Sequence, residues 1–190
     1  MKNILEVNKK IKKIDDDYFT NYGGKNYSES YLSYTISPHQ IIKEFLDKGI
    51  EISNLLDIGC ASGELVRDFR RLGVKAYGIE NNKSILKKCV VPQYCTLMDM
   101  RNLGEIKDNT FSVLYTNSLM YLWPNEIPSV LKQMNRIVEK AVYICVPFLK
   151  KNQVIFEDPY RTFLANEKWW ENQFITADFY KVSSNIYKKV

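Results

Sequence analysis

The chain has 190 residues, 45% of them hydrophobic, and a formal net charge of +5 at pH 7. This length is enough for one domain with a buried core and leaves no room for a second catalytic domain. The charge is modest and spread along the chain, so it does not indicate a nucleic-acid-binding stripe. No apolar run is long enough to span a bilayer, and no apolar signal segment opens the chain. We therefore expect no membrane contact and a cytoplasmic protein.

The cysteines and the single histidine predict no metal site. The cysteines are Cys60, Cys89, Cys95 and Cys145. They form no Cys-x-x-Cys pair, and His39 alone cannot build a histidine-rich site. We therefore expect no metal ion, and we expect reduced thiols that are mostly structural.

The segment before the first strand is expected to form two helices joined by a tyrosine-rich stretch. Residues 1 to about 15 place apolar side chains at helical spacing, namely Ile4, Val7, Ile11 and Ile14. The next stretch contains Gly23 and Gly24 among aromatic residues, which favours a flap that closes over a ligand. Packing of this stretch on the core is the alternative. Ser37 and Pro38 then begin a helix that Gly49 ends.

The stretch from Leu55 to Val66, LLDIGCASGELV, predicts a buried strand, a glycine loop and a helix. Open α/β sheets bind ligands at the carboxyl ends of parallel strands, where glycines let the backbone approach the ligand. The dinucleotide fingerprint needs small residues at two further positions, which are Ala61 and Glu64 here. A carboxylate is unfavourable beside a pyrophosphate and suits a cationic nucleoside such as S-adenosylmethionine. A nicotinamide cofactor, or a turn without a ligand, is the alternative.

This stretch resembles motif I of the class I S-adenosylmethionine-dependent methyltransferases. The resemblance implies an α/β fold with a Rossmann-like, doubly wound, mostly parallel sheet and helices on both faces. It implies one domain over residues 1–190, with an N-terminal helix and flap (1–36), a cofactor-binding core (37–150) and an acceptor-side segment (151–190). The motif I residues expected at S-adenosylmethionine are Asp57, Gly59, Cys60, Ala61 and Gly63. Tyr22 and Tyr27 resemble tyrosines that cover the methyl donor in many relatives.

The next two strands end in further cofactor positions, which are Glu80, Asn81, Asp99 and Met100. Glu80 ends the strand over 75–80, about 20 residues beyond the glycine loop, where a carboxylate can accept hydrogen bonds from both ribose hydroxyls. Asp99 and Met100 follow the strand over 94–98. In the family, an acidic residue here commonly binds the adenine amino group and its neighbour packs on the ring. For Asp99, a turn cap is the alternative.

The strand over 111–115 precedes the loop in which the methyl group and the acceptor are expected to meet. Asn117 and Tyr121 lie in this loop and are assigned to the cleft. Relatives usually have Asp at the position of Ser112 and often His at that of Tyr121, so a framework hydrogen-bonding group and the obvious base are both missing. Tyr121 and Asp158 are the remaining candidates for a general base.

The elements expected after this loop are a helix over 126–138, a strand over 141–146, a turn at 156–161 and a helix over 167–174. The turn is polar and aromatic, and its Tyr160 and Arg161 are the expected substrate contacts. The remaining residues leave room for one full closing strand or two very short ones. We therefore expect a shortened sheet edge, which a second copy of the chain can cover in a homo-oligomer.

Methyl transfer from a sulfonium is an in-line displacement that needs alignment and exclusion of water more than it needs a strong base. The expected function is therefore methylation of a small molecule, such as a sugar or another hydroxyl- or amine-bearing metabolite. A methyltransferase of a peptide, protein or RNA is one alternative. The stretch 117–120 lacks the Asn/Asp-Pro-Pro-Tyr/Phe signature of nucleic-acid amino methylation, which disfavours RNA. A catalytically silent S-adenosylmethionine-binding subunit is the other alternative.

Overall fold

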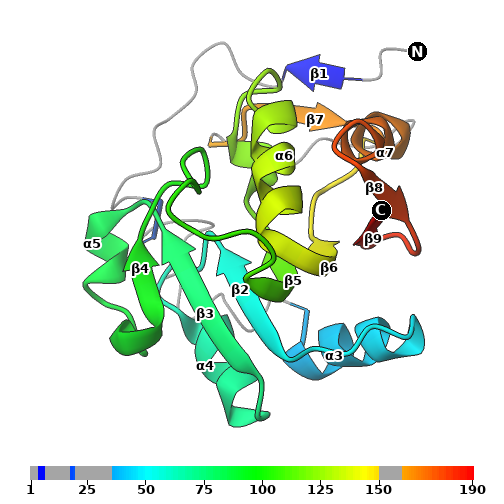
Figure 1. The fold of residues 1–190 in the computed structure, drawn as a ribbon. Helices are drawn as coiled ribbons and strands as arrows, with labels where there is room; N and C mark the ends of the chain where they lie inside the picture. The colour runs from blue at the N-terminus through cyan, green and yellow to red at the C-terminus, as the bar shows by residue number, and fades with distance from the viewer. Residues whose placement is uncertain (1–3, 7–17, 20–35, 150–159) are drawn as a thin grey trace.

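A seven-stranded sheet forms the centre of the fold. The computed structural model describes residues 4–6, 18–19, 36–149 and 160–190. The strands are β2 (Asn54–Ile58), β3 (Lys75–Glu80), β4 (Cys95–Leu97), β5 (Phe111–Thr116), β6 (Val138–Ile144), β8 (Phe179–Lys181) and β9 (Ile186–Lys189). Their order is β4-β3-β2-β5-β6-β9-β8 (Figure 1). Neighbours from β4 to β6 run parallel, and β9 is antiparallel to β6 and β8. This confirms the predicted mostly parallel, doubly wound sheet.

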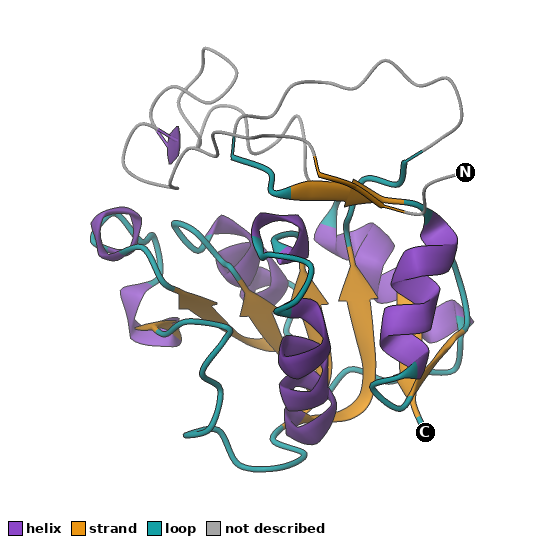
Figure 2. Cartoon of the chain, turned by 90° about the horizontal axis from the view of Figure 1, so that it is seen from above, coloured by secondary structure: helices purple, strands orange, loops and turns teal. Residues whose placement is uncertain are grey.

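Helices cover both faces of this sheet (Figure 2). They are α3 (Pro38–Asp47), α4 (Glu64–Arg71), α5 (Lys83–Leu86), α6 (Ile127–Ile137) and α7 (Glu167–Ile175), with 3-10 turns η2 (Pro92–Tyr94) and η3 (Leu119–Tyr121). Pro38 stands in the first turn of α3, where its missing N–H leaves no bond unmade. The Asn82 side chain caps α5 by accepting hydrogen bonds from two backbone N–H groups. The helices predicted at these places are therefore confirmed.

The alternation of side chains along the strands divides the core into two layers. Leu55 and Val113 face one layer, which contains residues of α3 and α4 such as Phe45 and Phe69. Their chain neighbours, such as Leu56, face the other layer, which contains residues of α6 and α7. All the residues of β5 are buried, because helices cover both of its faces. The carboxyl ends of these buried strands are thereby held in a rigid frame.

The N-terminal segment differs from the predicted helix where the structure describes it. Residues Ile4–Glu6 form a strand, β1, which pairs antiparallel with β7 (Phe163–Ala165). The helical spacing of the first residues misled the prediction at this point, because the hydrogen bonds to β7 come from the far end of the chain. Both strands lie at the top of Figure 1, the end at which β2 and β3 finish. Residues 7–17, which carry the rest of the predicted helix, and the flap at 20–35 lie outside the described residues.

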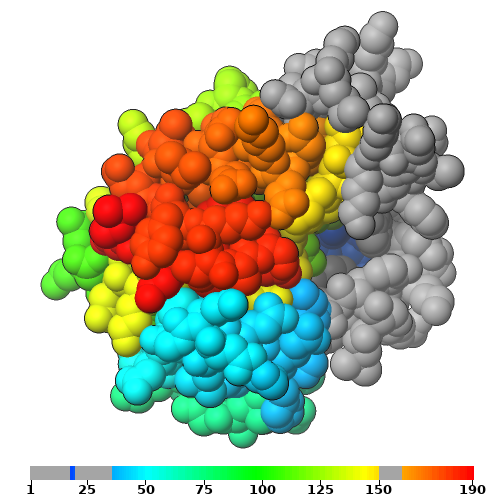
Figure 3. Space-filling view, turned by 90° about the vertical axis from the view of Figure 1, so that its right-hand side faces the viewer, coloured from blue at the N-terminus to red at the C-terminus, as the bar shows by residue number. Residues whose placement is uncertain are grey.

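The C-terminal edge of the sheet consists of two short strands, which is one of the two alternatives that the sequence left open. Strands β8 and β9 lie between α7 and α3 on the side of the molecule shown in Figure 3. Tyr180 of the edge strand β8 is 45% exposed. Among the described residues, no helix is long and apolar enough to cross a membrane. Within the same residues, no three His, Cys, Asp or Glu side chains are arranged to hold a metal ion.

Candidate cofactor and acceptor site

The glycine loop between β2 and α4 has a backbone conformation that few residues tolerate. Gly59 (φ 84°) and Gly63 (φ 78°) lie in the left-handed region, and so does Ala61 (φ 49°). A Cβ on Gly59 would lie 2.2 Å from Oγ of Ser118, so this position has no space for a side chain either. The N–H groups of Gly59 and Cys60 both donate hydrogen bonds to the carbonyl of Ile79 in β3. The loop is therefore fixed on two sides, by β3 and by the residues after β5.

Glu80 connects the end of β3 to the glycine loop. Its side chain is 7% exposed, and Oε2 accepts a hydrogen bond of 3.0 Å from the N–H of Ala61. Oε1 accepts one of 2.8 Å from the N–H of Asn82. Burial raises the pKa of Glu80, and the backbone donors Asn82, Ala61 and Asn81 counteract part of that rise. Because each carboxylate oxygen has two lone pairs, both oxygens keep the capacity to accept a hydroxyl from a ligand.

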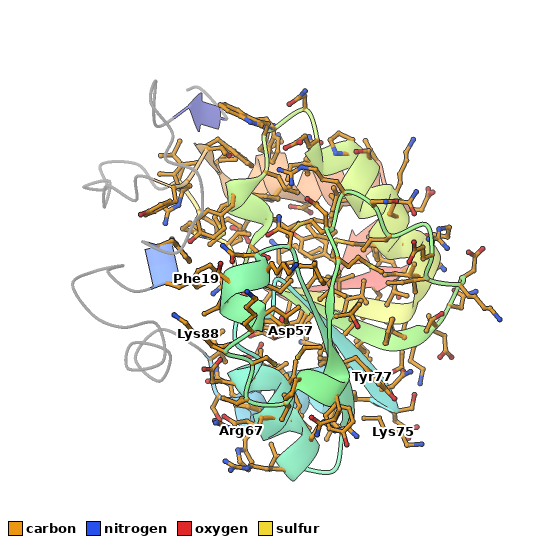
Figure 4. All side chains as sticks on the ribbon, turned by 90° about the vertical axis from the view of Figure 1, so that its left-hand side faces the viewer. Phe19, Asp57, Arg67, Lys75, Tyr77 and Lys88 are labelled. Carbon is orange, nitrogen blue, oxygen red and sulfur yellow. The ribbon has the colours of Figure 1, made fainter. Side chains whose placement is uncertain are left out.

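Three buried carboxyl groups surround this loop. Asp57, Glu64 and Glu80 are 3, 6 and 7% exposed. Burial raises the pKa of Asp57 well above its usual value, and the nearby charges of Cys95, Glu80 and Glu64 raise it further. In the described part of the chain, no lysine or arginine forms a salt bridge with any of the three. Figure 4 shows Asp57 in the interior, with Arg67 and Lys75 lower in the view and the exposed Lys88 toward the outside of the molecule. The site therefore favours a cationic ligand.

Asp99 lies where the sequence placed it, beyond the end of β4, but its hydrogen bonds are those of a turn cap. Its Oδ1 accepts a hydrogen bond of 2.8 Å from the N–H of Arg101, and its Oδ2 accepts one of 3.4 Å from Nδ2 of Asn81. The guanidinium of Arg101 forms salt bridges with Asp99 and Glu126 at 3.0 and 2.7 Å. Asn81 and Asp99 are thus brought together, while Met100 is half-buried against the core. The role of Asp99 and Met100 at an adenine ring stays a prediction.

A buried aromatic cluster packs against the glycine loop. Tyr18 packs edge-to-face on Phe19, Tyr121 and Tyr160, with ring centroids 4.9, 5.8 and 4.9 Å from its own. Its hydroxyl shares a hydrogen bond of 2.9 Å with the hydroxyl of Tyr121. Ala61 of the glycine loop belongs to the same buried cluster. The structure therefore brings together Tyr121 and Tyr160, two residues predicted to contact substrate, and does so through Tyr18.

Asn117 is exposed beyond the end of β5 and lines a small open cavity. The cavity has a volume of about 220 Å³ and is lined by Asn117, Ile144, Cys145, Val146, Pro147, Phe148 and Asn185. Its polar groups come from the two asparagines and the thiol, and the rest of its wall is apolar. Arg161 is half-buried beside Tyr160 in the chain and does not belong to this wall.

Ser112 takes part in the framework despite the expected loss of a hydrogen-bonding group at this position. Its Oγ accepts hydrogen bonds of 3.1 Å from the N–H groups of Ser53 and Asn54. It also donates to the carbonyl of Asn54. The sequence interpretation was wrong on this point, because a hydroxyl both donates and accepts and so replaces a carboxylate at the start of β2 and β5.

Three of the predicted site residues, Tyr22, Tyr27 and Asp158, lie outside the described residues, so their roles stay predictions. The sequence analysis did not single out Tyr18 and Phe19, which are 8 and 5% exposed. Their place in the tyrosine-rich segment was the available signal. That segment indicated a cover over a ligand, but it did not show which of its tyrosines reach the glycine loop.

The fold and the glycine loop define an α/β domain that binds a nucleoside at the carboxyl ends of its strands. Residues 56–146 match the family described as a methyltransferase domain. A malonyl-[acyl-carrier protein] O-methyltransferase of Buchnera aphidicola subsp. Baizongia pistaciae (strain Bp) is 25% identical over 134 residues, which are 68% of this chain and 53% of that protein. The chain therefore spans about half the length of this curated relative.

Two solved structures share the fold. DesVI of Streptomyces venezuelae has a TM-score of 0.67 and 16% identity, with 94% of this chain and 99% of that chain covered. The magnesium protoporphyrin IX methyltransferase of Synechocystis PCC 6803 with bound S-adenosylmethionine has a TM-score of 0.60 and 12% identity, with 92% and 94% covered. These two structures show that the chain shares their fold. The match of residues 56–146 assigns that segment to the methyltransferase-domain family, which the motif I stretch also resembles.

The residues of the site fit the cofactor of this family. S-adenosylmethionine carries a sulfonium and an ammonium group and has no phosphate. The buried carboxyl groups of Asp57, Glu64 and Glu80 supply negative charge without a lysine or arginine partner in the described part of the chain. A pyrophosphate would meet repulsion from the same three groups, so their charge disfavours a nicotinamide dinucleotide.

Proposed function

We propose that this protein is an enzyme that transfers the methyl group of S-adenosylmethionine to a small molecule bearing a hydroxyl or amine. The observation that carries the proposal is the set of buried carboxyl groups around a glycine loop that an aromatic cluster covers. When bound, the cofactor supplies a methyl group activated by its positively charged sulfur. The chain's own residues then bind the cofactor, align the acceptor and exclude water.

On the cofactor side, Glu80 is the residue that accepts hydrogen bonds from the ribose hydroxyls. The N–H groups of Ala61 and Asn82 each donate to one of its oxygens, which fixes the orientation of the carboxylate. Asp57 and Glu64 supply the negative charge that compensates the ammonium and sulfonium groups. The hydroxyl of Ser62 lies 2.7 Å from each oxygen of Glu64, which fixes this carboxyl group beside the loop.

On the acceptor side, Tyr121 is the residue that orients the acceptor. Its hydroxyl shares a hydrogen bond with Tyr18, so it can accept a hydrogen bond from an acceptor hydroxyl while it donates to Tyr18. Alignment alone contributes up to about 7–11 kcal/mol in the most favourable intramolecular reactions, so a strong base is not required. The aromatic rings of Tyr18 and Tyr160 exclude water from this region.

The cavity beside Asn117 supports a small acceptor. Its volume of about 220 Å³ is below the range of roughly 300–1,000 Å³ that is common for pockets of drug-sized ligands. Asn117 and Asn185 supply both donors and acceptors there. A carrier-bound acyl group is the second candidate, because the curated relative is named for a malonyl group on acyl-carrier protein.

The cofactor half of the proposal is tested by calorimetric binding of S-adenosylmethionine and S-adenosylhomocysteine, with NAD as the control ligand. We expect micromolar binding of both sulfur nucleosides and none of NAD. Glu80→Gln removes the negative charge that is expected at the ribose. It should lower the affinity for both sulfur nucleosides by about 10- to 100-fold, because a hydrogen bond to a charged group contributes about 1.5–3 kcal/mol. The matched variant Glu105→Gln changes an exposed carboxylate away from the loop and should bind normally. A folded wild-type protein that binds neither nucleoside contradicts the proposal.

The acceptor half is tested with S-adenosylmethionine labelled on its methyl group and extracts divided by ultrafiltration into small and large molecules. Label in the filtrate on a compound other than the cofactor, separated from it by chromatography, supports a small acceptor. Label that stays with proteins supports the carrier-bound candidate, and label on nucleic acid supports RNA. Cofactor binding without transfer to any fraction favours a catalytically silent subunit.

Association of two copies through β8 is a separate proposal. The edge strand exposes Tyr180, and an edge that is not covered pairs readily with another strand. Sedimentation of wild type and Tyr180→Lys tests it, since a charge at the edge should dissociate such a dimer. A wild-type protein that sediments as a monomer contradicts the proposal.

A further inference from the structure

Three of the four cysteines gather behind the glycine loop, although they lie far apart along the chain. A Cβ on Gly63 would lie 2.7 Å from Sγ of Cys89 and 3.0 Å from Sγ of Cys95, so both sulfurs contact the same point of the loop. A Cβ on Gly78 would lie 2.6 Å from Sγ of Cys60. Gly78 is also the residue of β3 that pairs with Cys95 in β4. All three sulfurs therefore lie in one cluster beneath the cofactor loop.

Two of these sulfurs differ from the third in access to solvent. Cys60 is 5% exposed, whereas Cys89 and Cys95 are half-buried. Cys89 follows the short helix α5, and Cys95 begins β4, with η2 between them. The backbone around Cys89 is tied to the glycine loop, because the N–H of Val90 donates to the carbonyl of Ser62 at 2.9 Å. A change at this pair is therefore transmitted directly to the loop.

The cluster also makes Cys95 the reactive thiol of the three. Hydrogen bonds from the Cys60 and Cys89 thiols stabilise its thiolate and lower its pKa to about 7, although burial and the charge of Glu64 act in the opposite direction. Burial raises the pKa of Cys89 to about 11. The Cys60 thiol is also held in its neutral form, by its hydrogen bond to Cys95 and by burial. Cys95 is thus the attacking sulfur and Cys89 the accessible partner beside it.

We propose that Cys95 and Cys89 form a reversible disulfide under the action of hydrogen peroxide, and that this bond weakens cofactor binding by displacing the glycine loop. The Cys95 thiolate attacks the peroxide oxygen, so that an S–O bond forms, the O–O bond breaks and water leaves after protonation. Cys89 then attacks the sulfenic sulfur, so that the S–S bond forms, the S–O bond breaks and a second water leaves. The two thiols lose two electrons in total, and the peroxide gains them.

The contact with Gly63 explains how the bond would affect the site. Two sulfurs in a disulfide are about 2.05 Å apart, so the pair that now contacts Gly63 cannot keep both of its positions. Gly63 has a left-handed backbone and precedes α4 directly, so a shift there moves the loop. The disulfide also removes the Cys95 thiolate, whose charge acts on Asp57. The effect on cofactor affinity rests on the proposed function, whereas the formation of the disulfide does not.

The first test is chemical and uses the full chain, reduced and then treated with hydrogen peroxide. Trypsin cuts after Lys88 and Arg101, so Cys89 and Cys95 lie in one peptide. We expect this peptide to become two hydrogens lighter and to return to its reduced mass with dithiothreitol. Cys89→Ser should leave Cys95 as a sulfenic acid, whereas Cys145→Ser, outside the cluster, should still form the disulfide. A Cys60–Cys95 link, or oxidation of Cys95 to sulfinic acid in the wild type, overturns the proposal.

The second test measures S-adenosylhomocysteine affinity of the reduced and oxidised wild type. We expect affinity about tenfold lower after oxidation, which corresponds to about 1.4 kcal/mol, and recovery after reduction. Oxidised Cys89→Ser should lose less affinity than the oxidised wild type. Equal affinity of the reduced and oxidised wild type would overturn the proposal that the disulfide weakens cofactor binding through the glycine loop. If the reduced protein binds no S-adenosylhomocysteine, the proposed function fails, while the mass of the peptide still decides whether the disulfide forms.

Discussion

The cofactor side and the proposed acceptor side of this site are built in different ways. The cofactor side follows from short stretches of sequence: a strand, a glycine loop and a helix, then a second strand that ends in a carboxylate. The acceptor side assembles residues from distant parts of the chain, since Tyr18, Tyr121 and Tyr160 meet in one cluster. Local rules determine the first, and tertiary contacts determine the second. Substitutions on the cofactor side should therefore have larger and more specific effects.

The largest effect is expected for Gly59→Ala. The added Cβ would lie 2.2 Å from Oγ of Ser118, at a backbone φ of 84° that alanine rarely adopts. Strain and overpacking each contribute about 1–3 kcal/mol, so we expect a loss of at least about 2 kcal/mol in the free energy of unfolding. Urea denaturation measures it. Gly49→Ala is the matched control, because Gly49 also has a positive φ but nothing within 4 Å of its Cβ position. Equal losses in the two variants would contradict the close contact.

The next effect is expected for Asp57→Asn, which should lower the affinity for S-adenosylmethionine while it stabilises the protein without ligand. Removal of a charged contact should reduce the affinity by about 10- to 100-fold. Removal of a buried charge should add roughly 0.5–2 kcal/mol to the free energy of unfolding, as single changes at functional sites often do. Calorimetry and urea denaturation measure the two effects. A lower free energy of unfolding together with unchanged affinity for S-adenosylmethionine would instead show that Asp57 supports the fold and does not contact the cofactor.

The same carboxyl groups predict how stability depends on pH. Burial raises the pKa of Asp57 and Glu80 in the folded protein, so the folded state holds these protons more tightly than the unfolded state does. Their contribution is fully present below the unfolded pKa values, about 3.9 and 4.3, and is lost as pH rises through the raised values. We expect the Tm without ligand to decrease over this window and Asp57→Asn to flatten the decrease. An unchanged slope in the variant would show that Asp57 does not titrate there.

The sequence predicted the sheet and the cofactor loop well because both depend on local patterns. Buried apolar runs gave the parallel strands, and the spacing from the glycine loop to Glu80 gave the carboxylate whose oxygens accept the N–H groups of Ala61 and Asn82. The pairing of β1 with β7 was missed, because a strand partner from the other end of the chain leaves no trace in the spacing of Ile4 and Val7.

The acceptor side could be predicted only in part, for the same physical reason. Composition showed that the N-terminal segment is rich in aromatic residues, but not that Tyr18 reaches the hydroxyl of Tyr121 at 2.9 Å. The cysteine cluster was missed as well. Its residues lack metal-ligand spacing along the chain, and their sulfurs meet through contacts at Gly63 and Gly78, which lie in different elements of the fold. Contacts between sequence-distant residues require the fold to be known.

A smaller effect is expected for Tyr121→Phe on the acceptor side. The variant keeps the ring that packs on Tyr18 and removes the hydroxyl that shares its hydrogen bond. The loss of stability should be about 0.5–1.5 kcal/mol, while turnover falls and cofactor affinity is unchanged. Tyr77→Phe, at an exposed position on β3, is the control and should change neither stability nor turnover. An equal fall in cofactor affinity would show that Tyr121 acts on the cofactor side.

Asp99→Ala, which distinguishes the two interpretations of this residue, is expected to change stability alone and so to have the smallest overall effect. As a turn cap, Asp99 accepts a hydrogen bond from the N–H of Arg101 and forms a half-exposed salt bridge with its guanidinium. Loss of both should lower the free energy of unfolding by about 0.5–1.5 kcal/mol, most of it from the hydrogen bond, because such ion pairs contribute little. An adenine contact would instead lower the affinity for S-adenosylhomocysteine at unchanged stability. Because Arg101 already occupies the carboxylate, we expect the stability effect to dominate, and denaturation and calorimetry on the same sample decide between the two.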